Sequence, residues 1–201
     1  MTEFTYEVTG VEATPGLTPS QTVGPFFHDA LPYENGPQVA GHNRRGAIRL
    51  HGRVLDGDGM PIPDSLVEIW QAAENGAFVE EPGVYQEVTG AGFRGFGRCP
   101  TGNDGSFEFV TVKPGAVPTV DGTTQAPHLA MSVFARGMLR RVVTRVYFDD
   151  EPDANAADPL LSSLEEDRRP TLIANAGEDG YRFDVHIQGD DETVFLDVFA
   201  R

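Results

Sequence analysis

Arginines gather in one short stretch of the chain, at Arg136, Arg140, Arg141 and Arg145. A guanidinium pairs with a carboxylate through charge-assisted hydrogen bonds, so this stretch is suited to binding a small organic acid. Arg136 precedes a glycine at the expected end of a strand, where an arginine can also be a solvated charge. The neighbouring arginines can meet the same anion or pair with the chain's own carboxylates. All four remain candidates for an anion site.

The chain as a whole is acidic, with 31 Asp and Glu against 15 Lys and Arg and a net charge of -16. Such a surface repels phosphates, so we expect no nucleic-acid partner. We interpret the acidity as a solvated surface rather than a docking site for a basic partner. A small anionic substrate would need a local positive site against this general field.

Short runs of alternating apolar and polar residues, separated by turn formers, predict strands with almost no helix between them. The expected strands are 48–54, 66–71, 107–112, 128–136, 141–148, 181–187 and 194–199. One short helix is expected over 158–168. The aromatic residues within the strands are expected in the core, namely Trp70, Phe107, Phe109, Phe183 and Phe195. The fold class is therefore mostly β, an antiparallel β-sandwich.

Residues 1–45 carry many Pro and Gly and little periodicity, so they predict an extended N-terminal arm that lies on another surface. Residues 46–201 then form the β-sandwich core domain. There is no apolar run long enough to span a bilayer and no signal-peptide pattern at residues 1–7, so we expect no membrane association. The single cysteine, Cys99, excludes an internal disulfide and favours the cytoplasm.

Several strings, in order, resemble the intradiol aromatic ring-cleaving dioxygenases. One is Leu66-Val67-Glu68-Ile69-Trp70-Gln71, and the others lie at 52–56, 63–65, 97–98, 104–107, 112–115, 126–128, 144–151 and 181–185. Each string is weak alone, but together they cover residues 18 to 198. The resemblance implies the β-sandwich of this family and cleavage of an aromatic ring by dioxygen.

Iron-binding members of this family use two tyrosinates and two histidines on a ferric ion, a ligand set that suits Fe(III). The matching positions in this chain are Phe78, Val117 and the pair His128 and Ala130. Only His128 carries a ligand atom, so the resemblance implies that this chain holds no iron. His128 is then a relic of the metal site, bound by hydrogen bonds.

The pattern resembles the iron-free α chains in the branch of the family that cleaves protocatechuate (3,4-dihydroxybenzoate) to 3-carboxy-cis,cis-muconate. In that branch an iron-bearing β chain is the partner and holds the Fe(III). The shared strings are Thr18-Pro19-Ser20-Gln21-Thr22-Val23-Gly24-Pro25 and Phe134-Ala135-Arg136-Gly137. The resemblance implies that Thr22, Gly24, Pro25 and Arg136 line the substrate pocket between the two chains, and that no catalytic residue lies on this chain.

His128 and Arg136 have the same strand parity, but a continuous strand separates them by ~26 Å at about 3.3 Å per residue. We therefore predict that they serve different places. Two alternatives stay open: a single-chain intradiol enzyme of the catechol or hydroxyquinol type, and a transthyretin-like β-sandwich module without enzymatic activity. Iron content separates the first from an iron-free chain, and dioxygen uptake separates the second.

Overall fold

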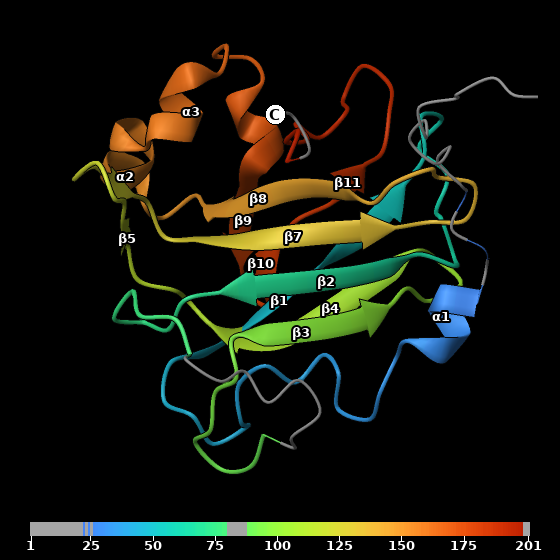
Figure 1. Cartoon of the computed structure of the whole chain (residues 1–201), viewed down its shortest axis with the longest axis horizontal. Coiled ribbons are helices and arrows are strands. Elements are labelled where there is room, and N and C mark those ends of the chain that lie inside the picture. Colours follow the sequence, from blue (N-terminus) through green and yellow to red (C-terminus); the bar gives the residue numbers. More distant parts are fainter. Residues whose placement is uncertain (1–21, 23, 25, 80–87, 199–201) are drawn as a thin grey trace, which may run out of the picture.

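The computed structural model describes residues 22, 24, 26–79 and 88–198, which fold around one mixed β-sheet (Figure 1). Its nine strands are β1 (Ala47–Leu55), β2 (Leu66–Gln71), β3 (Phe96–Pro100), β4 (Ser106–Val112), β7 (His128–Phe134), β8 (Val142–Phe148), β9 (Ile173–Gly177), β10 (Gly180–Arg182) and β11 (Val185–His186). A separate ribbon pairs β5 (Val117–Pro118) with β6 (Thr124–Gln125).

The strands run in the order β11-β1-β10-β9-β8-β7-β2-β3, and β4 pairs with β1. Since β4 also contacts β3, the sheet nearly closes on itself. Most pairs are antiparallel, as the sequence predicts, whereas β1 with β10, β1 with β11 and β8 with β9 are parallel. The expected β-sandwich class is confirmed, with three parallel pairs that local patterns do not reveal.

Strand β1 is held between β4 on one side and β10 and β11 on the other. At its middle, a Cβ on Gly52 would lie 1.7 Å from the carbonyl oxygen of Phe183, so only glycine fits there. The Phe183 amide donates to the His51 carbonyl at the same place. The Gly52 position thus allows the C-terminal segment to pack directly onto β1.

The core lies between the inward faces of the strands. Leu129, Met131 and Val133 of β7 are fully buried, and the residues between them are only half-buried. The same period of two is present in β4, where Phe107 and Phe109 are buried. Such alternation fixes the strand register, because a slip of one residue would expose the apolar set.

The described part of the chain has three short helices, two more than the sequence predicts: α1 (Phe26–Ala30), α2 (Pro152–Ala157) and α3 (Pro159–Ser163). A 3-10 helix follows at Arg169–Leu172. The expected helix over 158–168 ends early, because Leu164 is already extended. In Figure 1, α2 and α3 lie at one end of the sheet and α1 at the other.

Two other predictions are wrong. Residues 194–198 form no strand, although the amide of Leu196 donates to Val143 of β8. Trp70 is not a core residue: it is 39% exposed on the outer face and contacts the ring of Phe96. Neighbouring residues of a strand point to opposite faces, so Trp70 faces outward because Ile69 takes the buried position. The expected burial of Phe107, Phe109 and Phe183 is confirmed, and Phe195 packs against the core.

Residues before β1 also take part in the sandwich. Val39 and Ala40 are fully buried, and both amides donate to the carbonyl of Val110 in β4. The part of the expected arm that precedes β1 thus lies against the sheet. The division at residue 45 stays a prediction.

The chain's single lysine, Lys113, joins the turn after β4 to the turn after β8. Its ammonium lies 2.8 Å from Asp150 and 2.7 Å from Glu151, over the rings of Phe148 and Tyr181. Burial lowers the pKa of Lys113, but the hydrogen bonds with the two carboxylates raise it to a net value above the ordinary one. For Asp150, burial raises the pKa, and the hydrogen bonds from Lys113 and Tyr181 outweigh it and lower the pKa.

We predict that Lys113→Met lowers the free energy of unfolding at neutral pH by about 1 kcal/mol, since solvent screens the half-exposed Asp150. The depressed pKa of Asp150 means that this contribution is lost as the pH falls through it, below about 3.9. On the alkaline side it is lost only as the pH rises through the raised pKa of Lys113. Urea unfolding of both proteins across this range measures the difference. An equal difference at acid and neutral pH would contradict the assignment.

Candidate functional site

The arm helix and the end of strand β7 meet at one end of the sandwich. In Figure 1, helix α1 lies at the end of the sheet toward which the arrow of β7 points. Phe27 is the buried residue of α1, and its ring centroid is 6.4 Å from that of Phe134, the last residue of β7. Gly24 directly precedes this helix region, and Arg136 follows Phe134 by two residues. Two segments far apart in the sequence, both expected at the substrate pocket, are thus brought to the same end.

The predicted pocket residues that the structure describes are exposed. Thr22 and Gly24 are both at the surface, while Pro25 lies outside the described residues. A Cβ placed on Gly24 would have a ring carbon of Phe26 as its nearest neighbour, at 3.9 Å, which is an ordinary contact distance. The structure therefore leaves the side of the arm that carries these residues open.

Arg136 pairs with Asp64, the residue two positions before β2: its Nε lies 2.9 Å from the carboxylate. The Arg136 side chain is 65% exposed, whereas that of Asp64 is 21% exposed. The ion pair engages Nε, and a guanidinium has further N–H groups on its two terminal nitrogens. Asp64 thus fixes the base of a guanidinium whose outer edge faces solvent.

The alternative arginines lie in different surroundings. Arg140 and Arg141 are exposed in the turn between β7 and β8. Arg145 lies within β8 opposite Ala130, and its Nη1 donates to the hydroxyl of Tyr147 at 3.2 Å. Arg145 is therefore directed toward the His128 end of the sheet and away from Arg136.

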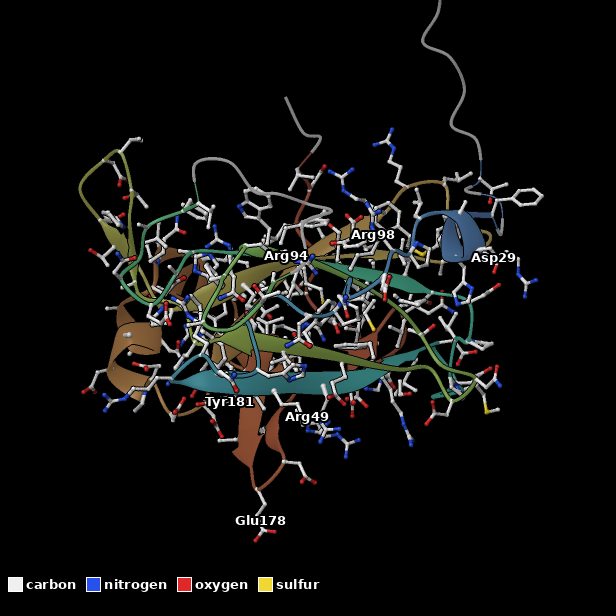
Figure 2. All side chains as sticks on the ribbon, turned by 90° about the horizontal axis from the view of Figure 1, so that it is seen from below. Asp29, Arg49, Arg94, Arg98, Glu178 and Tyr181 are labelled. Atoms are coloured by element: carbon white, nitrogen blue, oxygen red, sulfur yellow. The ribbon has the colours of Figure 1, made fainter. Side chains whose placement is uncertain are left out.

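Two cavities of the described chain lie elsewhere. One of about 480 Å³ is lined by residues of β1, β4 and β10, including Arg49, Arg53 and Arg182. Figure 2 shows Arg49 on this face, turned away from Arg94 and Arg98. A second of about 350 Å³ lies between the 3-10 helix and β10. Neither is lined by Thr22, Gly24, Arg136 or His128, and their arginines pair with nearby carboxylates.

His128 opens β7 at the opposite end from Arg136, which lies two residues beyond the strand's seven residues. Its Nδ1 lies 2.7 Å from the Ala126 carbonyl, and its ring is 5.5 Å from that of Tyr147. Burial lowers the pKa of His128, so the imidazole is neutral at neutral pH. The two residues thus have separate contacts, as the strand geometry predicts.

The surroundings of His128 do not fit a ferric ion. Ala130 shares its strand face, Val117 lies in β5, and Phe78 is an exposed side chain after the β2 strand; none has a ligand atom. Tyr147 is the nearby phenol, but burial raises its pKa well above the ordinary value. Its hydroxyl donates to Asp158 at 3.0 Å. Across the described residues, no group of three His, Cys, Asp or Glu side chains is placed to hold a metal.

Asp158 connects several segments at the His128 end of the sheet. The carboxylate is fully buried and accepts from the amides of Ala126, Leu160 and Leu161 as well as from Tyr147. It thereby caps α3 and joins that helix to β8 and the segment before β7. Four donors satisfy the buried carboxylate, which is otherwise costly to desolvate.

Sequence reasoning missed three residues near the arm: Phe27, Asp64 and Arg98. Arg98 donates to the carbonyl of Leu31, just after α1, and pairs with Glu68 of β2. The motif strings contain Asp64, Glu68 and Arg98 but do not say which of them reach the arm. The hydrophobic residue that follows Phe26 was a signal for a short amphipathic turn.

Comparison with known proteins follows this geometry. The family model named Dioxygenase matches residues 23–189. The chain is 43% identical over 198 residues to the protocatechuate 3,4-dioxygenase α chain of Burkholderia cepacia, covering 90% of this chain and 97% of that one. It is 32% identical to the β chain of the same enzyme and organism, covering 87% and 77%. Among solved structures, the dioxygenase domain of a Streptomyces sp. SirexAA-E carbohydrate-binding fusion matches with a TM-score of 0.56 and 26% identity, over 76% and 87%.

No helix of the described residues is both long and apolar enough to cross a membrane.

We predict that His128→Gln leaves the amount of bound iron unchanged when the chain is purified with its partner. The imidazole already contacts the Ala126 carbonyl, and the residues around His128 supply no ferric ligands. Iron is measured by elemental analysis and by tyrosinate charge-transfer absorption. The buried Asp158→Asn serves as the comparison, since it weakens the same end without touching His128 directly. Loss of iron in His128→Gln alone would show that this histidine is a ligand.

Proposed function

The chain belongs to the intradiol dioxygenase family, with the protocatechuate 3,4-dioxygenase α chains, and on that premise we propose that it completes the substrate pocket of an α/β enzyme. The enzyme would cleave protocatechuate between its hydroxylated carbons with dioxygen, giving 3-carboxy-cis,cis-muconate. This chain alone would be inactive. Support comes from the full-length match to an α chain and from the related β chain.

The observation that carries this proposal is the exposure of Arg136 beside the arm. A small-molecule site buries most of its ligand, typically about 70–90% of the ligand surface. Arg136, Thr22 and Gly24 are all exposed, and none of them lines either of the two cavities described above. A second chain placed over this end would supply the missing walls.

Each pocket residue has a role that follows from its chemistry. Arg136 would pair with the carboxylate that distinguishes protocatechuate from catechol. Gly24 would let the arm approach the flat ring, since it has no side chain, and Pro25 would stiffen that approach. Thr22 would add a hydroxyl to the pocket wall. Together they orient the substrate and exclude water.

The intradiol dioxygenases use ferric iron, which we assign to the partner β chain. When bound, ferric iron would supply the centre at which the two hydroxyl oxygens of the substrate are held and the ring is activated toward dioxygen. The misfit of the His128 end supports this assignment: Tyr147 is held as a phenol by burial and by Asp158.

The two alternatives are less well supported. A single-chain intradiol enzyme needs iron ligands, and Phe78, Val117 and Ala130 have none. A transthyretin-like module has no use for the arm, whereas here α1 is fixed to the sandwich by Phe27. We also propose that the chain is cytoplasmic, since its one cysteine, Cys99, cannot form a disulfide within the chain.

Co-expression with a protocatechuate 3,4-dioxygenase β chain, followed by dioxygen uptake on protocatechuate, tests the proposal. We expect uptake with the pair and none with either chain alone. Uptake by this chain alone, with stoichiometric iron, would favour the single-chain reading. No uptake with any partner would favour the module.

Within the active pair, we predict that Arg136→Ala raises KM for protocatechuate by at least about tenfold, since a charge-assisted pair is lost. Catechol, which lacks the carboxylate, should show little change. Arg182→Ala is a matched control, because its ion pair with Asp184 has nearly the same exposure, 63% and 23%. Assembly and iron content should match the wild type in both variants. Equal loss of KM, assembly and iron in Arg136→Ala would indicate a structural role instead.

A further inference from the structure

Helix α1 is the part of the structure that joins the arm to the sandwich. It begins one residue after Pro25 and ends at Ala30. We propose that two anchors, Phe27 on Phe134 and Arg98 on the end of α1, are positioning residues that set where Thr22 and Gly24 lie relative to Arg136. This inference rests on the proposed function and deepens it, since it names what holds the two halves of the pocket wall in register.

The first anchor is apolar. Phe27 is 6% exposed while its neighbour Phe26 is 77% exposed, so the helix has one buried side chain. The Phe27 ring lies against Phe134, which ends β7. Gly24 is three residues before Phe27 and Arg136 is two after Phe134. At most ~3.5 Å per residue, these tethers reach about 11 Å and 7 Å, so movement of the anchor moves both.

The second anchor is polar and lies at the other end of the helix. Nη1 of Arg98 donates to the Leu31 carbonyl at 2.8 Å, and the Leu31 amide donates back to Phe27. An arginine at this place satisfies a helix-end carbonyl. Nε and Nη2 of Arg98 both contact Glu68, at 2.8 and 2.6 Å, with side-chain exposures of 13% and 18%. The anchor is thus built on two strands, β3 and β2.

A further arginine, Arg94, holds the segment that follows α1 in the chain. Arg94 is 4% exposed, and its Nη2 donates to the carbonyls of Asn35 and Gly36 at 2.6 Å. Gly36 also accepts the amide of Arg98, and a Cβ on Gly36 would lie 2.5 Å from the Arg98 carbonyl oxygen. Figure 2 labels Arg94 and Arg98 close together on the same side of the molecule. The segment that leads from α1 to β1 is therefore fixed soon after the helix ends.

The guanidinium groups of Arg94 and Arg98 also lie over the ring of Tyr33, at 5.2 and 5.8 Å from its centroid. Cations over an aromatic face are attracted to it. Three of the chain's 15 basic residues, in an acidic molecule, thus serve the arm and its pocket: Arg94, Arg98 and Arg136. These three arginines lie where the arm and its pocket lie, whereas charges that only keep the surface solvated could lie anywhere on it.

The test uses the co-expressed α/β complex. Phe27→Ala should raise KM for protocatechuate at least about fivefold with kcat changed less than about twofold, because ground-state positioning is lost. Phe27→Leu should restore much of the wild-type KM. The double variant Arg98→Met/Glu68→Gln removes the polar anchor without leaving a half-buried unpaired carboxylate, and should raise KM similarly.

Leu161→Ala is the matched control, since Leu161 is also buried (3%) but lies in α3 at the opposite end. It should lower the unfolding temperature as Phe27→Ala does while leaving KM unchanged. A wild-type KM in Phe27→Ala and in the double variant, or an equal rise in KM in Leu161→Ala, would overturn the proposal about the anchors and leave the proposed function standing. Should Phe27→Ala not assemble, the double variant Arg98→Met/Glu68→Gln decides the matter: a raised KM supports the anchors and a wild-type KM overturns them. A wild-type pair without dioxygen uptake would instead overturn the proposed function.

Discussion

The buried face of β7 is the constraint on which the two ends of the molecule depend. Leu129, Met131 and Val133 are fully enclosed, so the strand can neither slip in register nor rotate without exposing them. The strand has seven residues, a span of roughly 20 Å. It therefore holds His128 at one end and Phe134, with Arg136 beyond it, at the other. Neither end can take part in the chemistry of the other.

On the proposed function, this separation lets the Arg136 end contribute to a substrate pocket although the His128 end offers no ferric ligand set. Around His128 the fold depends on Asp158, which accepts hydrogen bonds from the Ala126 amide and the Tyr147 hydroxyl. The end with Arg136 depends instead on α1 and on the turn before β2. Changes at the first end leave the second intact, since different contacts stabilise each.

Local patterns in the sequence predicted the longer strands, missed β3 and β9, and did not give the strand partners. Alternation identified β1, β2, β4, β7 and β8, because period two needs only neighbouring residues. The parallel pairs of β1 depend on contacts across the whole chain and on Gly52, which tolerates a close backbone approach. Trp70 was misplaced because an aromatic residue in a strand does not reveal which face is buried. Arg136 came from the family strings, while its partner Asp64 needed three-dimensional proximity.

The acidity of the chain gives the arginines near the arm more importance than their number suggests. A net charge of -16 opposes the approach of an anionic substrate over most of the surface. The guanidinium groups of Arg94 and Arg98 are occupied by backbone carbonyls, an aromatic ring and Glu68, so they are not available to bind a ligand. Arg136 differs, since Asp64 contacts its Nε and leaves the outer edge at the surface. On the proposed function, Arg136 is the arginine that meets the substrate carboxylate, and the anchors that hold α1 decide whether the arm meets the ring at the right distance from it.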